Sequence, residues 1–191
     1  MLFSLLTHRE YSLGKPSRID LTEDGKRNIY LEVETAVIKM IAGKVDFVHR
    51  DKEGNVLYDS KRERLAQQQW FAETVSKYRT LDKTLEQLLK SYQEAVRDPD
   101  NEFLYLYEIR DAIATRFGSK KNSLKQLGIV EKDWSLLGEL SNKRNIKQGR
   151  HRGEFAGLLR EADASELEMA RKIAVSLIEK YLLYLEKHTD L

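Results

Sequence analysis

The chain has 191 residues, of which 41% are hydrophobic and 34% charged; this is enough apolar material for a buried core and excludes the disordered class. It contains no cysteine, which excludes disulfides, thiolate nucleophiles and cysteine-based zinc sites. The net charge of +2 does not by itself predict a polyanionic partner.

The amino-terminal sequence MLFSLLTHREYSLG lacks the basic leader and the small-residue cleavage site of a signal peptide. No apolar run approaches the roughly 20 residues that cross a bilayer. The absence of cysteine fits a reducing compartment. We therefore expect a cytoplasmic protein with no membrane partner.

Residues 1–60 show the period-two alternation of strands. Residues 18–21 alternate polar and apolar side chains, and apolar residues recur at every second position over 29–33. Residues 44–58 contain two apolar runs around a polar, glycine-containing turn, which predicts a hairpin. Residues 35–42 fit either a strand or one helical turn. We predict a small N-terminal antiparallel sheet of three to five strands.

Beyond residue 60 the apolar residues recur at helical spacing. Proline and glycine residues divide this part of the chain, because proline interrupts a helix and glycine commonly ends one. The predicted helices span residues 60–78, 81–97, 103–117, 122–127 and 131–140. The predicted fold class is therefore α+β, with a β-rich region at 1–60 and a helical domain at 61–191.

The last predicted helix begins at Ser165-Glu166-Leu167-Glu168, which has the spacing of a capping box between Ser165 and Glu168. Its apolar residues from Leu167 to Leu185 then fall on a single stripe. Three apolar residues lie off that stripe, and they predict a second contact, either with another chain or with the N-terminal sheet. They are Val175, Leu183 and Tyr184.

Positive charge is concentrated between Lys120 and Arg160, where ten basic and four acidic residues give a local excess of +6. Five of these cations and no acid lie between Lys143 and Arg152. Glycines in the same stretch let backbone N–H groups approach an anion closely. Two interpretations stay open: a solvated basic turn and a phosphate-binding loop.

The spacing of Arg144, Asn145 and His151 resembles the signature of HEPN domains. In those domains an Arg is followed by a polar residue, and a His lies a few residues further on; here six residues separate Arg144 from His151. The stretch also leads into the final long helix of a helical domain, as it does in that family. The resemblance covers roughly residues 61–190 and implies a HEPN-like helical bundle.

The resemblance implies a metal-independent endoribonuclease, for example a toxin or defence effector, or a relative that binds RNA or protein without cleaving. Such domains pair as homodimers with two motifs facing one cleft, and an antitoxin or other protein partner can silence them. His151 would exchange a proton with the attacking or leaving oxygen. Arg144 would hold the phosphate in a bidentate fork, and Asn145 would orient the phosphate or the imidazole. No metal or cofactor is implied.

The motif also departs from the family pattern. Gly149 and the added Arg150 and Arg152 point to an extended loop rather than a compact helical turn. If the Arg and the His diverge in space, RNA binding survives without catalysis, and residues 149–153 become the phosphate-contacting unit. The predicted phosphate-binding residues are Lys143, Lys147, Arg150 and Arg152.

Two acidic residues, Glu108 and Asp111, share a face of the predicted helix at 103–117. They could order the basic stretch by pairing with it, or form an exposed charged flank. Tyr105 and Tyr107 could stack on bases or belong to the core. No phosphate-binding P-loop, dinucleotide fingerprint or HExxH sequence is present. A ribonuclease, a non-catalytic RNA- or protein-binding module and a structural oligomerisation protein thus remain as hypotheses.

Overall fold

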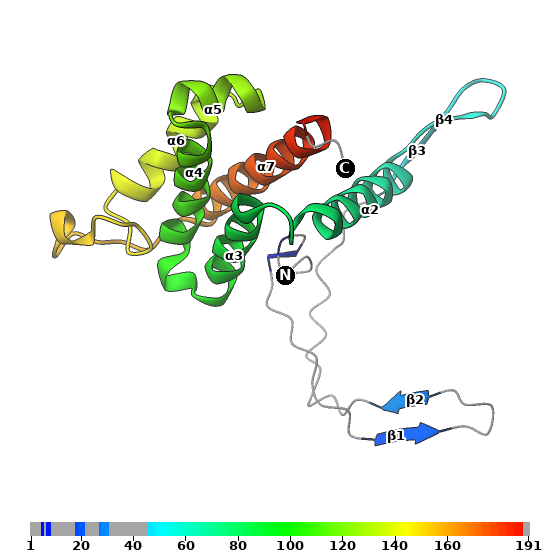
Figure 1. Ribbon diagram of the computed structural model, residues 1–191, viewed down its shortest axis with the longest axis horizontal. Helices are drawn as coiled ribbons and strands as arrows, with labels where there is room; N and C mark the ends of the chain where they lie inside the picture. The colour runs from blue at the N-terminus through cyan, green and yellow to red at the C-terminus, as the bar shows by residue number, and fades with distance from the viewer. Residues whose placement is uncertain (1–4, 6, 9–17, 22–26, 31–45, 189–191) are drawn as a thin grey trace. The chain divides into compact units, whose positions relative to one another are not determined.

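The computed structural model describes residues 5, 7–8, 18–21, 27–30 and 46–188. The chain divides into two compact units, one formed by Met1–Glu10 with Leu65–Leu191 and the other by Tyr11–Arg64. Short antiparallel strands precede a helical bundle, so the predicted α+β fold class is confirmed (Figure 1).

The strands form two separate hairpins. Strand β1 (Arg18–Leu21) pairs antiparallel with β2 (Arg27–Tyr30), and β3 (Val48–Arg50) pairs antiparallel with β4 (Val56–Asp59). The described residues therefore hold two two-stranded sheets instead of the single sheet of three to five strands that we predicted. The ambiguous stretch at 35–42 lies outside the described residues.

The turn between β3 and β4 is held by one aspartate. The Asp51 carboxylate accepts backbone N–H bonds from Glu53 at 2.9 Å and Asn55 at 2.8 Å, and Gly54 adopts a φ of +89°. A side-chain hydrogen bond from Asn55 lowers the pKa of Asp51. The polar, glycine-containing sequence thus closes the hairpin as predicted.

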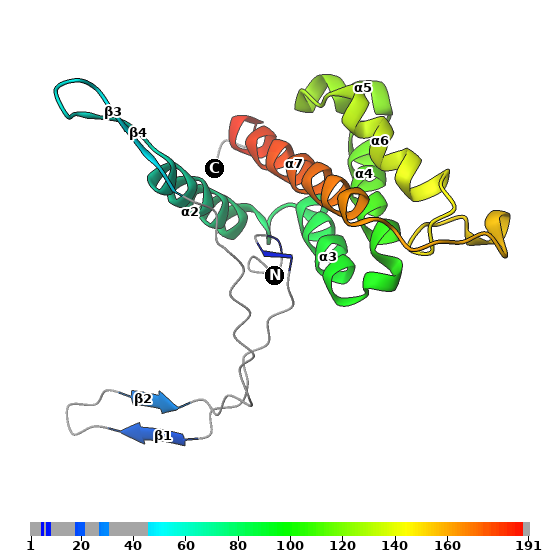
Figure 2. The ribbon, with the colours of Figure 1, turned by 180° about the vertical axis from the view of Figure 1, so that it is seen from behind.

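The helical elements are α2 (Ser60–Tyr78), α3 (Lys83–Arg97), η1 (Pro99–Asn101), α4 (Glu102–Phe117), α5 (Lys120–Leu127), α6 (Glu131–Asn142), η2 (Arg152–Phe155) and α7 (Ala164–His188). Helix α4 contacts α3, α5, α6 and α7 and is the centre of the bundle. Helix α7 passes behind α4 in Figure 1 and in front of it in Figure 2, so these two helices are stacked.

Local signals explain where these helices begin and end. Asp82 caps α3, because its carboxylate accepts the backbone N–H of Leu85 at 2.7 Å. Helix α4 ends at Gly118 and α5 at Gly128, both in the left-handed conformation, with φ of +77° and +58°. Asp98 ends α3 immediately before Pro99.

The capping box at the start of α7 lies two residues earlier than predicted. The backbone N–H of Asp163 donates to the Glu166 carboxylate at 2.9 Å, so the reciprocal bond of the capping box joins residues 163 and 166. Glu168 instead pairs with Lys172 at 2.6 Å on the surface. The predicted box between Ser165 and Glu168 is therefore wrong in register.

The predicted apolar stripe of α7 is buried, and only Leu167 at its first position is half-buried. Two of the residues off the stripe, Val175 and Tyr184, pack against this bundle's own core. The ring of Tyr184 lies 5.1 Å from that of Phe117, centroid to centroid. The prediction that all three contact another chain or the sheet is thus wrong for these two, while Leu183 is exposed.

A buried ionic group links α4 to α7 and to the amino terminus. Glu102 is 1% exposed and accepts two hydrogen bonds from Arg171, at 2.6 and 2.7 Å, while His8 Nε2 lies 3.3 Å away. Burial would raise the pKa of Glu102, but the bonds from Arg171 and His8 hold it below its usual value. Burial, with the nearby Glu102 charge, raises the pKa of Tyr92 to about 12.

Candidate functional site

The basic segment, residues 143–152, follows α6 and begins the long connection to α7, which extends away from the helices at one end of the bundle (Figure 1). Its backbone is fixed by a parallel bridge between Ile146 and Arg160. The Lys147 N–H donates to the Arg160 carbonyl at 2.9 Å, and Ile146 is 1% exposed. The segment is therefore anchored on a buried apolar side chain.

Gly149 lets this segment turn back against α6. The Arg150 N–H donates to the Ser141 carbonyl at 2.8 Å. A Cβ atom at Gly149 would lie 3.1 Å from the Ile146 carbonyl oxygen and 3.2 Å from that of Ser141. The glycine thus provides room for a close backbone approach, in an extended loop as predicted.

Arg144 is bound by two carboxylates. Its guanidinium donates to Glu139 at 2.8 and 3.1 Å and to Glu166 at 2.6 Å. Arg160 also donates to Glu166, at 2.7 and 2.8 Å. These bonds, first those from Arg160, lower the pKa of Glu166 to about 2. Arg144 thus joins the end of α6 to the start of α7.

Asn145 and Arg152 also brace the segment. The Asn145 amide donates to the Leu158 carbonyl at 2.7 Å. Arg152 donates to the carbonyls of Gly149 at 3.0 Å and Asp100 at 2.9 Å, and to the Asn101 side chain. Asn145, predicted to orient the phosphate or the imidazole, and Arg152, predicted to bind phosphate, therefore tie the segment together and to η1.

The remaining predicted cations face solvent. Lys143 is exposed, and its side chain forms no ion pair or hydrogen bond with any described residue. Lys147 pairs with Glu161 at 2.7 Å, and both side chains are more than half exposed. Ion pairs in such surroundings are weak, so a phosphate can replace the carboxylate.

Arg150 connects the segment to α4. Its guanidinium carbon lies 4.3 Å from the centroid of the Tyr107 ring, and its Nη1 lies 3.6 Å from the Asp111 carboxylate. Asp111 thus pairs with the basic segment, as one of the two interpretations held. Glu108 instead accepts a hydrogen bond from Ser91 at 3.1 Å.

His151 is exposed, and its Nδ1 lies 3.8 Å from Glu154 Oε1, beyond hydrogen-bond distance. Within the described part of the chain, no hydrogen bond or ion pair joins His151 to Arg144 or to Asn145. The three predicted catalytic residues therefore share one segment but have separate partners.

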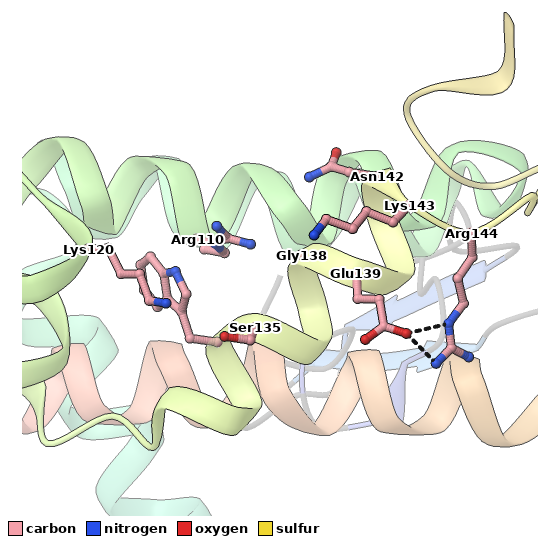
Figure 3. Close-up of a pocket in the computed structure, with 9 residues that line it drawn as sticks. Arg110, Lys120, Ser135, Gly138, Glu139, Asn142, Lys143 and Arg144 are labelled. Carbon is pink, nitrogen blue, oxygen red and sulfur yellow. Dashed lines mark hydrogen bonds and ion pairs between the residues drawn. The ribbon is translucent and has the colours of Figure 1, made fainter. Parts of the chain in front are cut away.

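A cavity of about 600 Å³ lies between α4, α5 and α6, beside the basic segment (Figure 3). No pattern in the sequence predicted this cavity, although a Trp and a Gly four residues apart on α6 and an Arg within apolar α4 were the available signals. Its lining residues are Arg110, Lys120, Trp134, Ser135, Gly138, Glu139, Asn142, Lys143 and Arg144.

Three further findings concern metal binding, the membrane and the similarity to known proteins. No group of three or more His, Cys, Asp or Glu side chains within the described ranges is arranged to hold a metal ion. None of the helices among the described residues is long and apolar enough to span a bilayer. No family model, curated protein or solved structure matches this chain.

Proposed function

We propose that this protein is a HEPN-like module that binds RNA through the exposed cations of the basic segment. One observation carries the proposal: Lys143, Lys147 and Arg150 are exposed on a segment whose backbone is held by hydrogen bonds. The side chains of Asn145 and Arg152 brace the same segment. A braced row of cations binds phosphates without first having to be ordered. The resemblance in the motif supports RNA as the polyanion.

The partners of the cations in the basic segment favour RNA binding over RNA cleavage. Arg144 donates to two carboxylates, one of them on Glu166, which is 4% exposed. To grip a phosphate in a bidentate fork, Arg144 would have to give up one of these partners. The ion-pair partners of Lys147 and Arg150 are exposed, so a phosphate can replace them at little cost.

Metal-independent RNA cleavage is the second candidate, and the exposure of His151 favours it. Its imidazole is half exposed and free of close hydrogen bonds within the described residues, so it can take or give a proton. In this version two copies of the chain would bring their motifs together in a homodimer. Such an activity would suit a toxin or defence effector held in check by a protein partner.

The test incubates labelled single-stranded RNA with the protein in EDTA and records binding and cleavage together. We expect the wild type to bind RNA. Binding should be weaker in Lys147→Ala and in Arg150→Gln, and unchanged in Lys90→Ala. Lys90 is an exposed cation on α3, away from the segment. Failure of the wild type to bind RNA at low salt would overturn the proposal.

Cleavage is judged with His151→Ala. Cutting by the wild type alone establishes the second candidate and assigns proton transfer to His151. Equal cutting by both proteins indicates a contaminant or another site. Binding without cutting leaves the non-catalytic module. Light scattering during gel filtration tells whether the active species is a homodimer.

A further inference from the structure

The cavity between α4, α5 and α6 contains three buried polar atoms with no hydrogen-bond partner among the described residues. They are Arg110 Nε, Trp134 Nε1 and Asn142 Oδ1, and all three residues line the cavity. Trp134 is 1% exposed. Buried polar groups in folded proteins are nearly always paired, so these three atoms need partners, which a bound water or a polar ligand in the cavity can supply.

The charges around the cavity favour an anion. Lys120 pairs with Glu131 at 2.8 Å, and Arg144 pairs with Glu139, the single acid of the lining. Arg110 and Lys143 have no ion-pair partner among the residues described. Figure 3 shows Arg144 turned toward Glu139, while the ammonium end of Lys143 points to the side on which Arg110 lies.

The guanidinium of Arg110 is held in place by its neighbours. Its central carbon lies 4.8 Å from the centroid of the Tyr107 ring and 5.1 Å from that of the Trp134 ring. Aromatic rings over its faces leave the N–H groups in its plane as the donors for a ligand. Gly138 is needed for this position, since a Cβ there would collide with Nη1 of Arg110.

We propose that this cavity binds a small phosphorylated ligand through its phosphate group. The donors come from separate elements: Arg110 from α4, Trp134 from α6 and Lys143 from the residue after α6. Donors on several sides suit a tetrahedral phosphate, whereas a planar carboxylate offers two oxygens in one plane. Asn142 can accept from a hydroxyl of the same ligand.

The size of the cavity suits a small molecule and not a lone ion. About 600 Å³ lies within the range of small-ligand pockets. A phosphate occupies only part of that space, so the rest would hold the group that bears it. The proposal does not depend on RNA binding by the basic segment, although a terminal RNA phosphate is a second source of the same chemistry.

Isothermal titration calorimetry with glucose 6-phosphate, inorganic phosphate and glucose tests the proposal. We expect both phosphates to bind, the sugar phosphate more tightly, and glucose not to bind. Lys143→Ala removes a charged donor and is expected to weaken binding about tenfold. Trp134→Phe removes a neutral donor and is expected to weaken binding about threefold. Gly138→Ala displaces the guanidinium and is expected to abolish measurable binding.

The control Lys90→Ala removes an exposed cation elsewhere and should bind as the wild type does. Circular dichroism confirms that each variant is folded, and the exposed position of Lys143 makes its variant the safest. Absence of binding to both phosphates, or equal binding by wild type, Lys143→Ala and Gly138→Ala, would overturn the proposal.

Two further titrations separate this site from the basic segment. A short RNA with a 5′ phosphate is compared with the same RNA carrying a 5′ hydroxyl. Tighter binding of the phosphorylated RNA, lost in Gly138→Ala, would identify a terminal RNA phosphate as the ligand of the cavity. Loss of sugar-phosphate binding in Gly138→Ala, with RNA binding retained, confirms the cavity alone. Loss of RNA binding in Lys147→Ala, with sugar-phosphate binding retained, would assign RNA binding to the basic segment and sugar-phosphate binding to the cavity.

Discussion

The central ionic group of the site offers the sharpest test of how the basic segment is held. Glu166→Gln keeps the shape of the side chain but removes the charge that binds Arg144 and Arg160. The pKa of Glu166 is lowered from 4.5 to about 2. A difference of that size corresponds to about 3 kcal/mol of folding free energy, and partial exposure of both arginines reduces it to about 2 kcal/mol.

The dependence on pH follows from the direction of this shift. Because the folded pKa is depressed, the stabilisation is complete above about pH 5 and is lost as the pH falls toward about 2. Urea unfolding followed by circular dichroism should therefore find Glu166→Gln about 2 kcal/mol less stable than the wild type at neutral pH. The two proteins should converge at about pH 2.

A matched control is Glu168→Gln, which removes a carboxylate from the same helix; among the described residues this carboxylate pairs only with Lys172, and that pair is exposed. Little or no loss of stability is expected for it. Equal stability of Glu166→Gln and the wild type at neutral pH, or a gap that stays constant down to about pH 2, would refute the reasoning.

Three other substitutions test the bundle by the same urea unfolding. Asp82→Ala removes the cap of α3, with its 2.7 Å bond from the Leu85 N–H, and should cost about 1 kcal/mol, most of which Asp82→Asn should recover. Arg171→Ala leaves Glu102 buried without its main partner and should cost about 3–5 kcal/mol. Gly118→Ala places a side chain at a φ of +77° and should cost about 1 kcal/mol. An unchanged free energy of unfolding in any of them would contradict the role given to that residue.

The helix boundaries could be predicted because local signals determine them. Gly118 and Gly128 end their helices in the left-handed conformation, and Pro99 follows directly on the end of α3. The apolar stripe of α7 was likewise readable, because burial on one face imposes the helical period on the sequence.

The register of the α7 cap could not be predicted from spacing alone. Asp163 with Glu166 and Ser165 with Glu168 have the same separation, and both fit the pattern of a capping box. Tertiary bonds decide between them: Arg144 and Arg160 hold the Glu166 carboxylate at the start of the helix. Their positions depend on the folding of the whole connection.

The concentration of positive charge at the site was predictable, but the partner of each cation was not. Arg144 and Glu166 are 22 residues apart in the sequence, and nothing between them indicates that they meet. The cavity was missed for a similar reason. Arg110 and Trp134 lie on different helices, and the absence of a partner for their nitrogen atoms is a property of the folded chain.

The most direct test of the central claim is the salt dependence of RNA binding, measured by fluorescence anisotropy with labelled single-stranded RNA. Binding through phosphate contacts makes the logarithm of the association constant fall linearly with the logarithm of the salt concentration. A Lys147→Ala, Arg150→Gln double variant loses two such contacts, so its slope should be shallower by about 1.4. An identical slope and affinity for both proteins, or no binding by the wild type at low salt, would contradict the account.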